Sequence, residues 1–114
     1  MKTVPNPTPP NAAIAELAQG LGVEDARDLV SMFLKGFEPT LAALESTDHE
    51  EQRRAAHSLK SSARIVGLLE LSHVMGQIED RLGRANSSVT KADFAKIRKL
   101  YGEGSPALSA YAGA

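Results

Sequence analysis

Apolar residues recur every three or four positions along most of this 114-residue chain, and this spacing constrains its fold more than any other feature. Such a step matches the turn of an α-helix and places one side of each helix against a shared core. No segment alternates apolar and polar residues as a half-buried strand does. Since the chain lacks cysteine and has few aromatic residues, that core must consist mainly of aliphatic side chains. The pattern predicts an all-α fold.

The pattern divides the chain into helical segments with recognisable ends. Asn11 is the expected N-cap of a short first helix, which Gly20 and Gly22 end. A second segment spans about residues 23–44 and a third spans about residues 48–66. The fourth segment has one apolar stripe, formed by Leu71, Val74, Met75, Ile78 and Leu82.

Thr90 and Asp93 have the spacing of a capping box and predict the start of a fifth segment. Pro106 and two nearby glycines weaken this segment. Its end is therefore expected to be either a separate helix that begins after Ser105 or a bent continuation of the same helix.

These segments predict the domain organisation. Short connections favour antiparallel neighbours, so we predict an antiparallel up-down four-helix bundle with a short extra N-terminal helix, spanning residues 11–114. Residues 1–10 hold four of the six prolines and show no apolar periodicity. They are predicted to form a flexible Pro-rich tail.

Charge and hydropathy exclude several classes of partner. The formal net charge of −1 offers no basis for binding nucleic acid or an anionic membrane. No apolar run approaches the roughly 18–20 residues that span a bilayer, and no apolar block follows Lys2 to form a signal peptide. We expect a cytoplasmic protein. Because the apolar stripes are just sufficient to fill one core, with no strongly apolar face left over, we also expect a monomer.

One histidine of the third segment is expected to face solvent among cations. At about 100° per residue, Leu59 and Val66 lie opposite His57 and face the core. The residues on the same side as His57 are Arg53, Arg54, Lys60, Ser61 and Arg64. An imidazole nitrogen can carry a phosphoryl group, and the ammonium of Lys60 can contact phosphoryl oxygens. The same pattern also fits an ordinary solvated helix face.

Other kinds of site find little support in the sequence. His49 and His73 have no partner at ligand spacing, so no metal site is expected. No Gly-rich phosphate loop is present, and no proline follows His57 as in the dimerisation helices of sensor kinases. We therefore expect no cofactor, no ATP binding and no autophosphorylation.

Residues 56–67 resemble the signature of histidine-containing phosphotransfer (HPt) domains, which runs roughly His-x-Leu-Lys-Gly-Ser-x-x-x-x-Gly. The matching residues are His57, Leu59, Lys60, Ser62 and Gly67. Ser61 stands where the family usually has glycine, and Arg64 stands where it often has a small or polar residue. The resemblance covers roughly residues 25–100.

The resemblance implies a phosphoryl carrier rather than an autonomous enzyme. An HPt domain accepts a phosphoryl group from a receiver-domain aspartate, or from a sensor or hybrid kinase, and passes it to a response-regulator receiver. By this resemblance His57 is the acceptor and Lys60 stabilises the phosphoryl group, while the receiver supplies magnesium. Glu79 either bonds the other ring nitrogen of His57 or is an ordinary boundary acid. The expected supporting or docking residues are Arg53, Arg54, Ser61, Arg64 and Gly67.

Two other interpretations stay open. The bundle could be a docking module that binds a receiver or kinase without carrying phosphate, in which case replacing His57 would leave it active. A small metal-dependent or acid–base enzyme has less support, because no second catalytic group converges on His57. The chain is expected to be either free-standing or a domain of a hybrid kinase.

Overall fold

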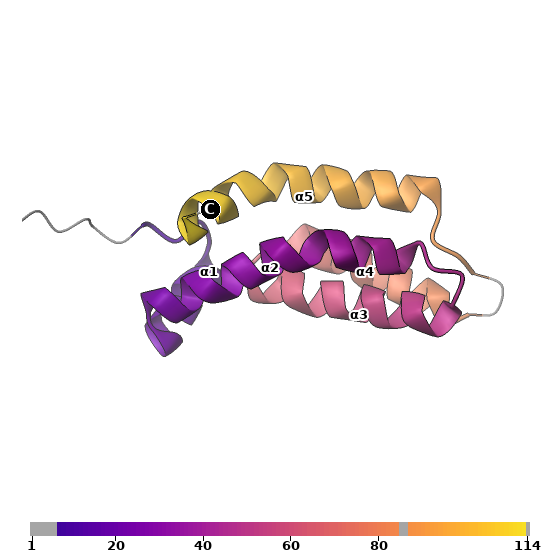
Figure 1. Cartoon of the computed structure of the whole chain (residues 1–114), viewed down its shortest axis with the longest axis horizontal. Coiled ribbons are helices and arrows are strands. Elements are labelled where there is room, and N and C mark those ends of the chain that lie inside the picture. Colours follow the sequence, from indigo (N-terminus) through magenta and orange to yellow (C-terminus); the bar gives the residue numbers. More distant parts are fainter. Residues whose placement is uncertain (1–6, 85–86, 114) are drawn as a thin grey trace, which may run out of the picture.

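Five α-helices make up the part of the chain that the computed structural model describes, residues 7–84 and 87–113 (Figure 1). They are α1 (Ala12–Leu21), α2 (Val23–Leu44), α3 (His49–Ile65), α4 (Leu69–Leu82) and α5 (Lys91–Ala112). None of the described residues lies in a strand. The predicted all-α class is confirmed. The tail predicted for residues 1–10 lies mostly outside the described residues.

Helices α2 to α5 run up and down as a bundle, and α1 packs against α2 at one end (Figure 1). The most extensive packing joins α3 and α4, and α3 also packs against α2. The predicted up-down four-helix bundle with an extra N-terminal helix is therefore confirmed. None of the described helices is both long enough and apolar enough to cross a membrane.

Side-chain caps begin three of the helices close to the predicted positions. The Asn11 side chain accepts the N–H of Ile14 at the start of α1, and Asp48 accepts two backbone N–H groups at the start of α3. Thr90 and Asp93 form the predicted capping box at the start of α5. Each cap satisfies N–H groups that a helix start otherwise leaves without a partner.

The core lies between all five helices. Its largest fully buried side chains are Ile14, Phe37, Leu41, Leu44, Leu59, Leu71, Met75, Ile78, Leu82, Ile97, Leu108 and Tyr111. On α3, three alanines (Ala55, Ala56 and Ala63) accompany Leu59 on the buried face. Small side chains let neighbouring helices approach closely, so α4 can lie close to α3.

Helix α5 is one continuous helix, and the alternative of a separate helix after Ser105 is wrong. The last turns of α5 curve toward α1 (Figure 1), and Leu108 and Tyr111 are buried there. A Cβ atom at Gly104 would lie 2.5 Å from Cδ2 of Leu68. The missing side chain at Gly104 therefore lets α5 approach the α3–α4 connection, and this packing offsets the poor helix propensity of the segment.

Candidate functional site

His57 lies in the middle of α3 with its imidazole in solvent. Its side chain is 60% exposed, whereas Ala56 and Leu59 beside it are buried. The helical spacing in the sequence predicts this orientation. A partner protein can therefore reach the ring without any opening of the bundle.

Glu79 of α4 bonds both His57 and the lysine one turn further along α3. Its Oε2 lies 2.8 Å from Nδ1 of His57, and its Oε1 lies 2.7 Å from Nζ of Lys60. The Glu79 side chain is only 20% exposed, so the carboxylate forms the inner wall of the site. Of the two alternatives for Glu79, the structure places it on the ring nitrogen of His57.

The contact with Glu79 selects one form of the imidazole. An ionised carboxylate only accepts hydrogen bonds, so Nδ1 of His57 must donate its proton to Oε2. In the neutral ring, Nε2 then holds the free electron pair. The nitrogen with nucleophilic character is therefore the one that Glu79 does not occupy.

The charge on Glu79 is stabilised by its two partners. The hydrogen bond from Lys60 lowers the pKa of Glu79 most. Partial burial acts in the opposite direction, and the hydrogen bond from His57 lowers the pKa further. Glu79 is thus ionised at neutral pH, as the bond to Nδ1–H requires.

The remaining predicted residues of α3 contribute less directly. Arg53 lies 3.6 Å from a carboxylate oxygen of Glu50, in an exposed pair of the kind that contributes little. Arg54, Ser61 and Arg64 are exposed, and within residues 7–84 and 87–113 no ion pair is found for Arg54 or Arg64. Of the predicted cations, only Lys60 bonds Glu79, which is also the partner of His57.

Gly67 shapes the end of α3 and lies away from His57, because the stretch of helix from His57 to Ile65 alone spans about 12 Å at 1.5 Å per residue. Its φ of 81° is left-handed, and its N–H and that of Leu68 bond the carbonyls of Arg64 and Ala63. This Schellman arrangement turns the chain directly into α4. A Cβ at this position would lie 2.3 Å from Cγ of Asn11, whose side chain donates to the Val66 carbonyl.

Two residues of α4 beside the site carry no motif of their own. Ser72 donates a hydrogen bond to the carbonyl of Lys60, and Gly76 lies next to the stem of the Lys60 side chain. Their spacing from Glu79, at seven and three residues, places all three on one side of a helix. That spacing is the signal in the sequence that would have found them.

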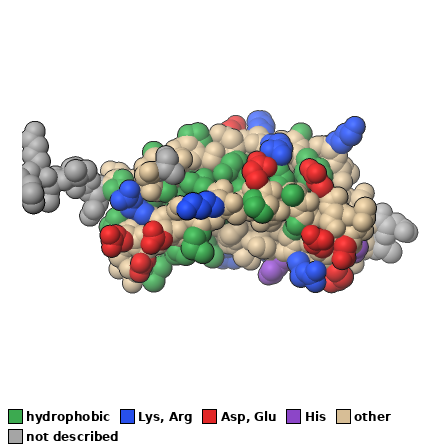
Figure 2. Space-filling model, viewed as in Figure 1, with side chains coloured by type: hydrophobic (Ala, Val, Ile, Leu, Met, Phe, Trp, Pro, Cys, Tyr) green, Lys and Arg blue, Asp and Glu red, His purple; other side chains and the backbone are tan. Residues whose placement is uncertain are grey.

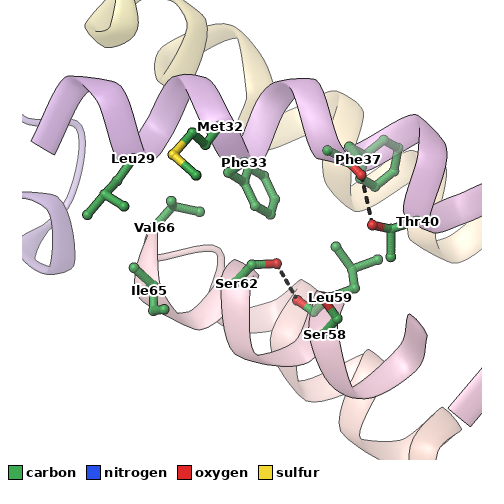
Figure 3. Close-up of a pocket in the computed structure, with 11 residues that line it drawn as sticks. Leu29, Met32, Phe33, Phe37, Thr40, Ser58, Leu59, Ser62, Ile65 and Val66 are labelled. Carbon is green, nitrogen blue, oxygen red and sulfur yellow. Dashed lines mark hydrogen bonds between the residues drawn. The ribbon is translucent and has the colours of Figure 1, made fainter. Parts of the chain in front are cut away.

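An apolar groove of about 270 Å³ lies between α2 and α3 and reaches the residue that follows His57. Ser58, the next residue, lines the groove, and Figure 3 shows Leu29 and Met32 of α2 directed toward Val66 across it. Met32 is 66% exposed, and Ile65 is half exposed. The expectation that no strongly apolar face would be left over is therefore wrong for this surface.

Among the described residues, no three histidine, aspartate or glutamate side chains converge in a way that could hold a metal ion. The hydroxyl of the buried Tyr111 has no hydrogen-bond partner there, and it lies on α5 rather than at the site.

A family model described as the Hpt domain matches residues 13–103. No curated protein and no solved structure matches the chain. The matched range takes in His57, Lys60 and Glu79 together with α2, α3 and α4. The chain therefore belongs to the Hpt domain family, whose members have a histidine phosphotransfer role in two-component signalling.

Proposed function

We propose that this protein carries a phosphoryl group on Nε2 of His57 between partners of a two-component phosphorelay. The observation that carries the proposal is the exposed imidazole of His57 with its Nδ1 bound by Glu79. That bond leaves Nε2 as the nucleophile and directs it away from α4. The ammonium of Lys60 lies 2.7 Å from Oε1 of Glu79, and it therefore borders the space around the imidazole.

The proposed transfer exchanges one bond to phosphorus for another. Nε2 of neutral His57 attacks the phosphorus of an aspartyl phosphate on a receiver domain. The N–P bond forms while the bond from phosphorus to the aspartyl oxygen breaks, and the aspartate departs as a carboxylate. The ring is then a cation that keeps its proton on Nδ1, against Glu79. The reverse sequence delivers the phosphoryl group to the aspartate of another receiver.

The partners supply what this chain lacks. We propose that the receiver holds magnesium in its acidic pocket and that a sensor or hybrid kinase is an alternative donor. Lys60 contacts the phosphoryl oxygens as a point charge. The protein itself is a carrier without kinase activity, so ATP alone is expected to leave His57 unmodified.

We propose that the receiver docks over the apolar groove between α2 and α3. The groove lies next to the reactive position, because Ser58 lines it and directly follows His57. Its wall includes the exposed Met32 and Ile65, and large exposed apolar side chains of this kind mark interaction surfaces. A receiver placed there covers His57 and the groove together. On the other side of the ring, the small side chain of Ser61 leaves room for it.

The proposed site of action is the cytoplasm, and the proposed active form is a monomer, since a second copy on the groove would block the receiver. Light scattering coupled to size-exclusion chromatography tests the monomer. A dimer that persists on dilution would contradict it.

The deciding experiment uses phosphoramidate, a small donor that needs no docking surface. Wild-type protein should gain one acid-labile, base-stable phosphoryl group, detectable by ³¹P NMR and intact mass, whereas the matched variant His57→Gln should gain none. Phosphorylated receiver domains from the source organism then serve as natural donors. Equal labelling of both proteins, or of neither, would contradict the carrier role.

A docking module without phosphoryl transfer is the second candidate, and the exposed groove favours it. The two functions separate in cells, because a docking module keeps its signalling output in the His57→Gln variant and a carrier loses it.

A further inference from the structure

Lys60 is contacted along its whole length by one stripe of α4. The stripe consists of Ser72, Gly76 and Glu79, and we refer to it as the Lys60 stripe. Steps of four and three residues place these positions above one another on a single helix face, and that face is directed at α3.

Each member of the Lys60 stripe meets a different part of the lysine. The hydroxyl of Ser72 donates to the Lys60 carbonyl over 2.8 Å. At the other end, Oε1 of Glu79 lies 2.7 Å from Nζ. Between them, a Cβ added to Gly76 would lie 3.3 Å from Cδ of Lys60, so the lysine stem passes over the one position of the stripe that has no side chain.

Ser72 is placed to hold this arrangement firmly. It is only 9% exposed and is the single buried polar residue among those described. A buried hydroxyl is costly unless it is hydrogen-bonded, and here the bond is made to the backbone of the lysine beside His57. This hydrogen bond therefore contributes to the register between α3 and α4 at the site.

A lysine side chain is long and flexible, and it loses much freedom when it is fixed. On an exposed helix face its ammonium would sample many positions. The Lys60 stripe fixes the backbone at one end, accepts the ammonium at the other and clears a path for the stem. Only the terminal bonds then need to rotate for the ammonium to turn from Glu79 toward His57.

We propose that Ser72 and Gly76 are positioning residues for phosphoryl transfer, which hold Lys60 so that its ammonium stays within reach of a phosphoryl group on His57. The inference rests on the proposed function of His57. It assigns a role to two residues that touch neither the imidazole nor the phosphoryl group.

The test compares Gly76→Ala with a matched control, Gly102→Ala. Both positions lie inside helices, but a Cβ at Gly102 meets nothing within 4 Å. Alanine favours helices over glycine. In Gly76→Ala this gain opposes the weakening of the Lys60–Glu79 pair, so both variants should remain fully folded in urea unfolding. Gly76→Ala should nevertheless take up phosphate from phosphoramidate about five- to tenfold more slowly, which corresponds to roughly one lost hydrogen bond. Gly102→Ala should react at the wild-type rate.

A double-mutant cycle shows whether Gly76 acts through the lysine. In a Lys60→Met background, adding Gly76→Ala should cause no further loss of rate, because the stem that it displaces no longer carries an ammonium. If the rate losses of Lys60→Met and Gly76→Ala multiply in the double variant, the positioning role is overturned. A Gly76→Ala rate equal to that of wild type would overturn it as well. Ser72→Ala should slow the reaction in the same way and should also be silent in the Lys60→Met background.

A readout without phosphate separates this inference from the proposed function. Because the hydrogen bond from Lys60 lowers the pKa of Glu79, displacing the ammonium should raise that pKa in Gly76→Ala, as followed by ¹³C NMR of the carboxyl group. An unchanged titration would overturn the positioning of Lys60 even if His57 is phosphorylated. If wild-type protein takes up no phosphate, the proposed function fails and the role in transfer fails with it, while the titration still reports the contact.

Discussion

At the scale of the residue, a single side chain, Glu79, links His57 and Lys60. It accepts from Nδ1 of His57 and from Nζ of Lys60, and its negative charge strengthens both bonds. A carboxyl group whose pKa is lower in the folded chain than in the unfolded chain stabilises the fold. That stabilisation is complete above the ordinary pKa of 4.5 and is lost as the pH falls through the lower folded value.

Replacing Lys60 by methionine should raise the pKa of Glu79 toward its ordinary value, because the largest cause of the lowering is removed. A ¹³C NMR titration of the glutamate carboxyl groups measures this directly. Arg54→Met is the control, since Arg54 is an exposed cation of the same helix with no ion pair among the described residues. A Glu79 titration that is the same in Lys60→Met and wild type would show that the ion pair does not persist in solution.

Gly67 is the residue on which the exit from α3 depends. An alanine there would have to adopt a φ of 81° and would place its Cβ 2.3 Å from Asn11. We expect Gly67→Ala to lower the free energy of unfolding by about 2 kcal/mol, measured by urea denaturation. Gly20→Ala, where the added Cβ meets nothing within 4 Å, should be neutral or stabilising. A loss at Gly67 no larger than that at Gly20 would contradict the account of the turn.

At the scale of the helix, Asp93 joins the start of α5 to the end of α4. Its carboxylate accepts from the Thr90 N–H within the capping box and from both terminal nitrogens of the Arg81 guanidinium. Burial opposes ionisation of this carboxyl group, but the bonds from Arg81 and Thr90 outweigh it and lower the pKa of Asp93. The negative charge therefore stabilises the contact between the end of α4 and the start of α5 near neutral pH.

Asp93→Asn should lower the free energy of unfolding by about 1 kcal/mol near neutral pH, the usual effect of weakening a helix cap. Because the folded pKa lies below the ordinary 3.8, the difference from wild type should shrink as acid protonates Asp93 in the folded protein. Urea unfolding near neutral pH and in acid measures the loss of unfolding free energy and its dependence on pH. Asp80→Asn, at an exposed position of α4, is the control, and a difference that grows in acid would be the contrary result.

The sequence predicts the helices better than it predicts their contacts. Caps such as Asn11 and Thr90 fix helix starts locally, so these were predictable. The continuity of α5 was not, because it depends on buried packing at Leu108 and Tyr111 that overrides local propensity. In the same way, the spacing within α3 predicts that His57 and Lys60 share one helix face. The role of Ser72 and Gly76, in contrast, depends on the way α4 lies against α3.

The surface of the whole molecule is mixed in charge and uneven in apolar exposure. On the face in Figure 2, basic and acidic side chains are interspersed and neither sign forms a dominant patch, in keeping with the net charge of −1. Of the four large apolar side chains that are exposed within residues 7–84 and 87–113, three come from α1, α2 and α3: Leu21, Met32 and Ile65. Partner selection is therefore expected to depend on apolar contacts on that side more than on long-range charge.

Met32→Glu should weaken binding of a receiver domain at least about tenfold, because a carboxylate would be buried without a partner. Phosphorylation by phosphoramidate should not change, since that donor does not use the groove. Leu69→Glu is a closely matched control, because Leu69 is 65% exposed and Met32 is 66% exposed, yet Leu69 does not line the groove. Titration calorimetry with the receiver that accepts phosphate most rapidly measures the effect, and equal weakening by both variants would place the interface elsewhere.

If His57 carries a phosphoryl group as proposed, the proton between Nδ1 and Glu79 also affects how readily that group is transferred onward. When a phosphorylated imidazole keeps this proton, the ring departs from phosphorus as a neutral molecule, which is a good leaving group. Loss of the proton would make the departing ring an anion and would strengthen its hold on phosphorus. In the proposed carrier, the carboxylate of Glu79 keeps Nδ1 protonated and so lets the ring depart as a neutral molecule on delivery. Because loading passes through the same transition state in reverse, the loss of Glu79 should slow both directions of transfer.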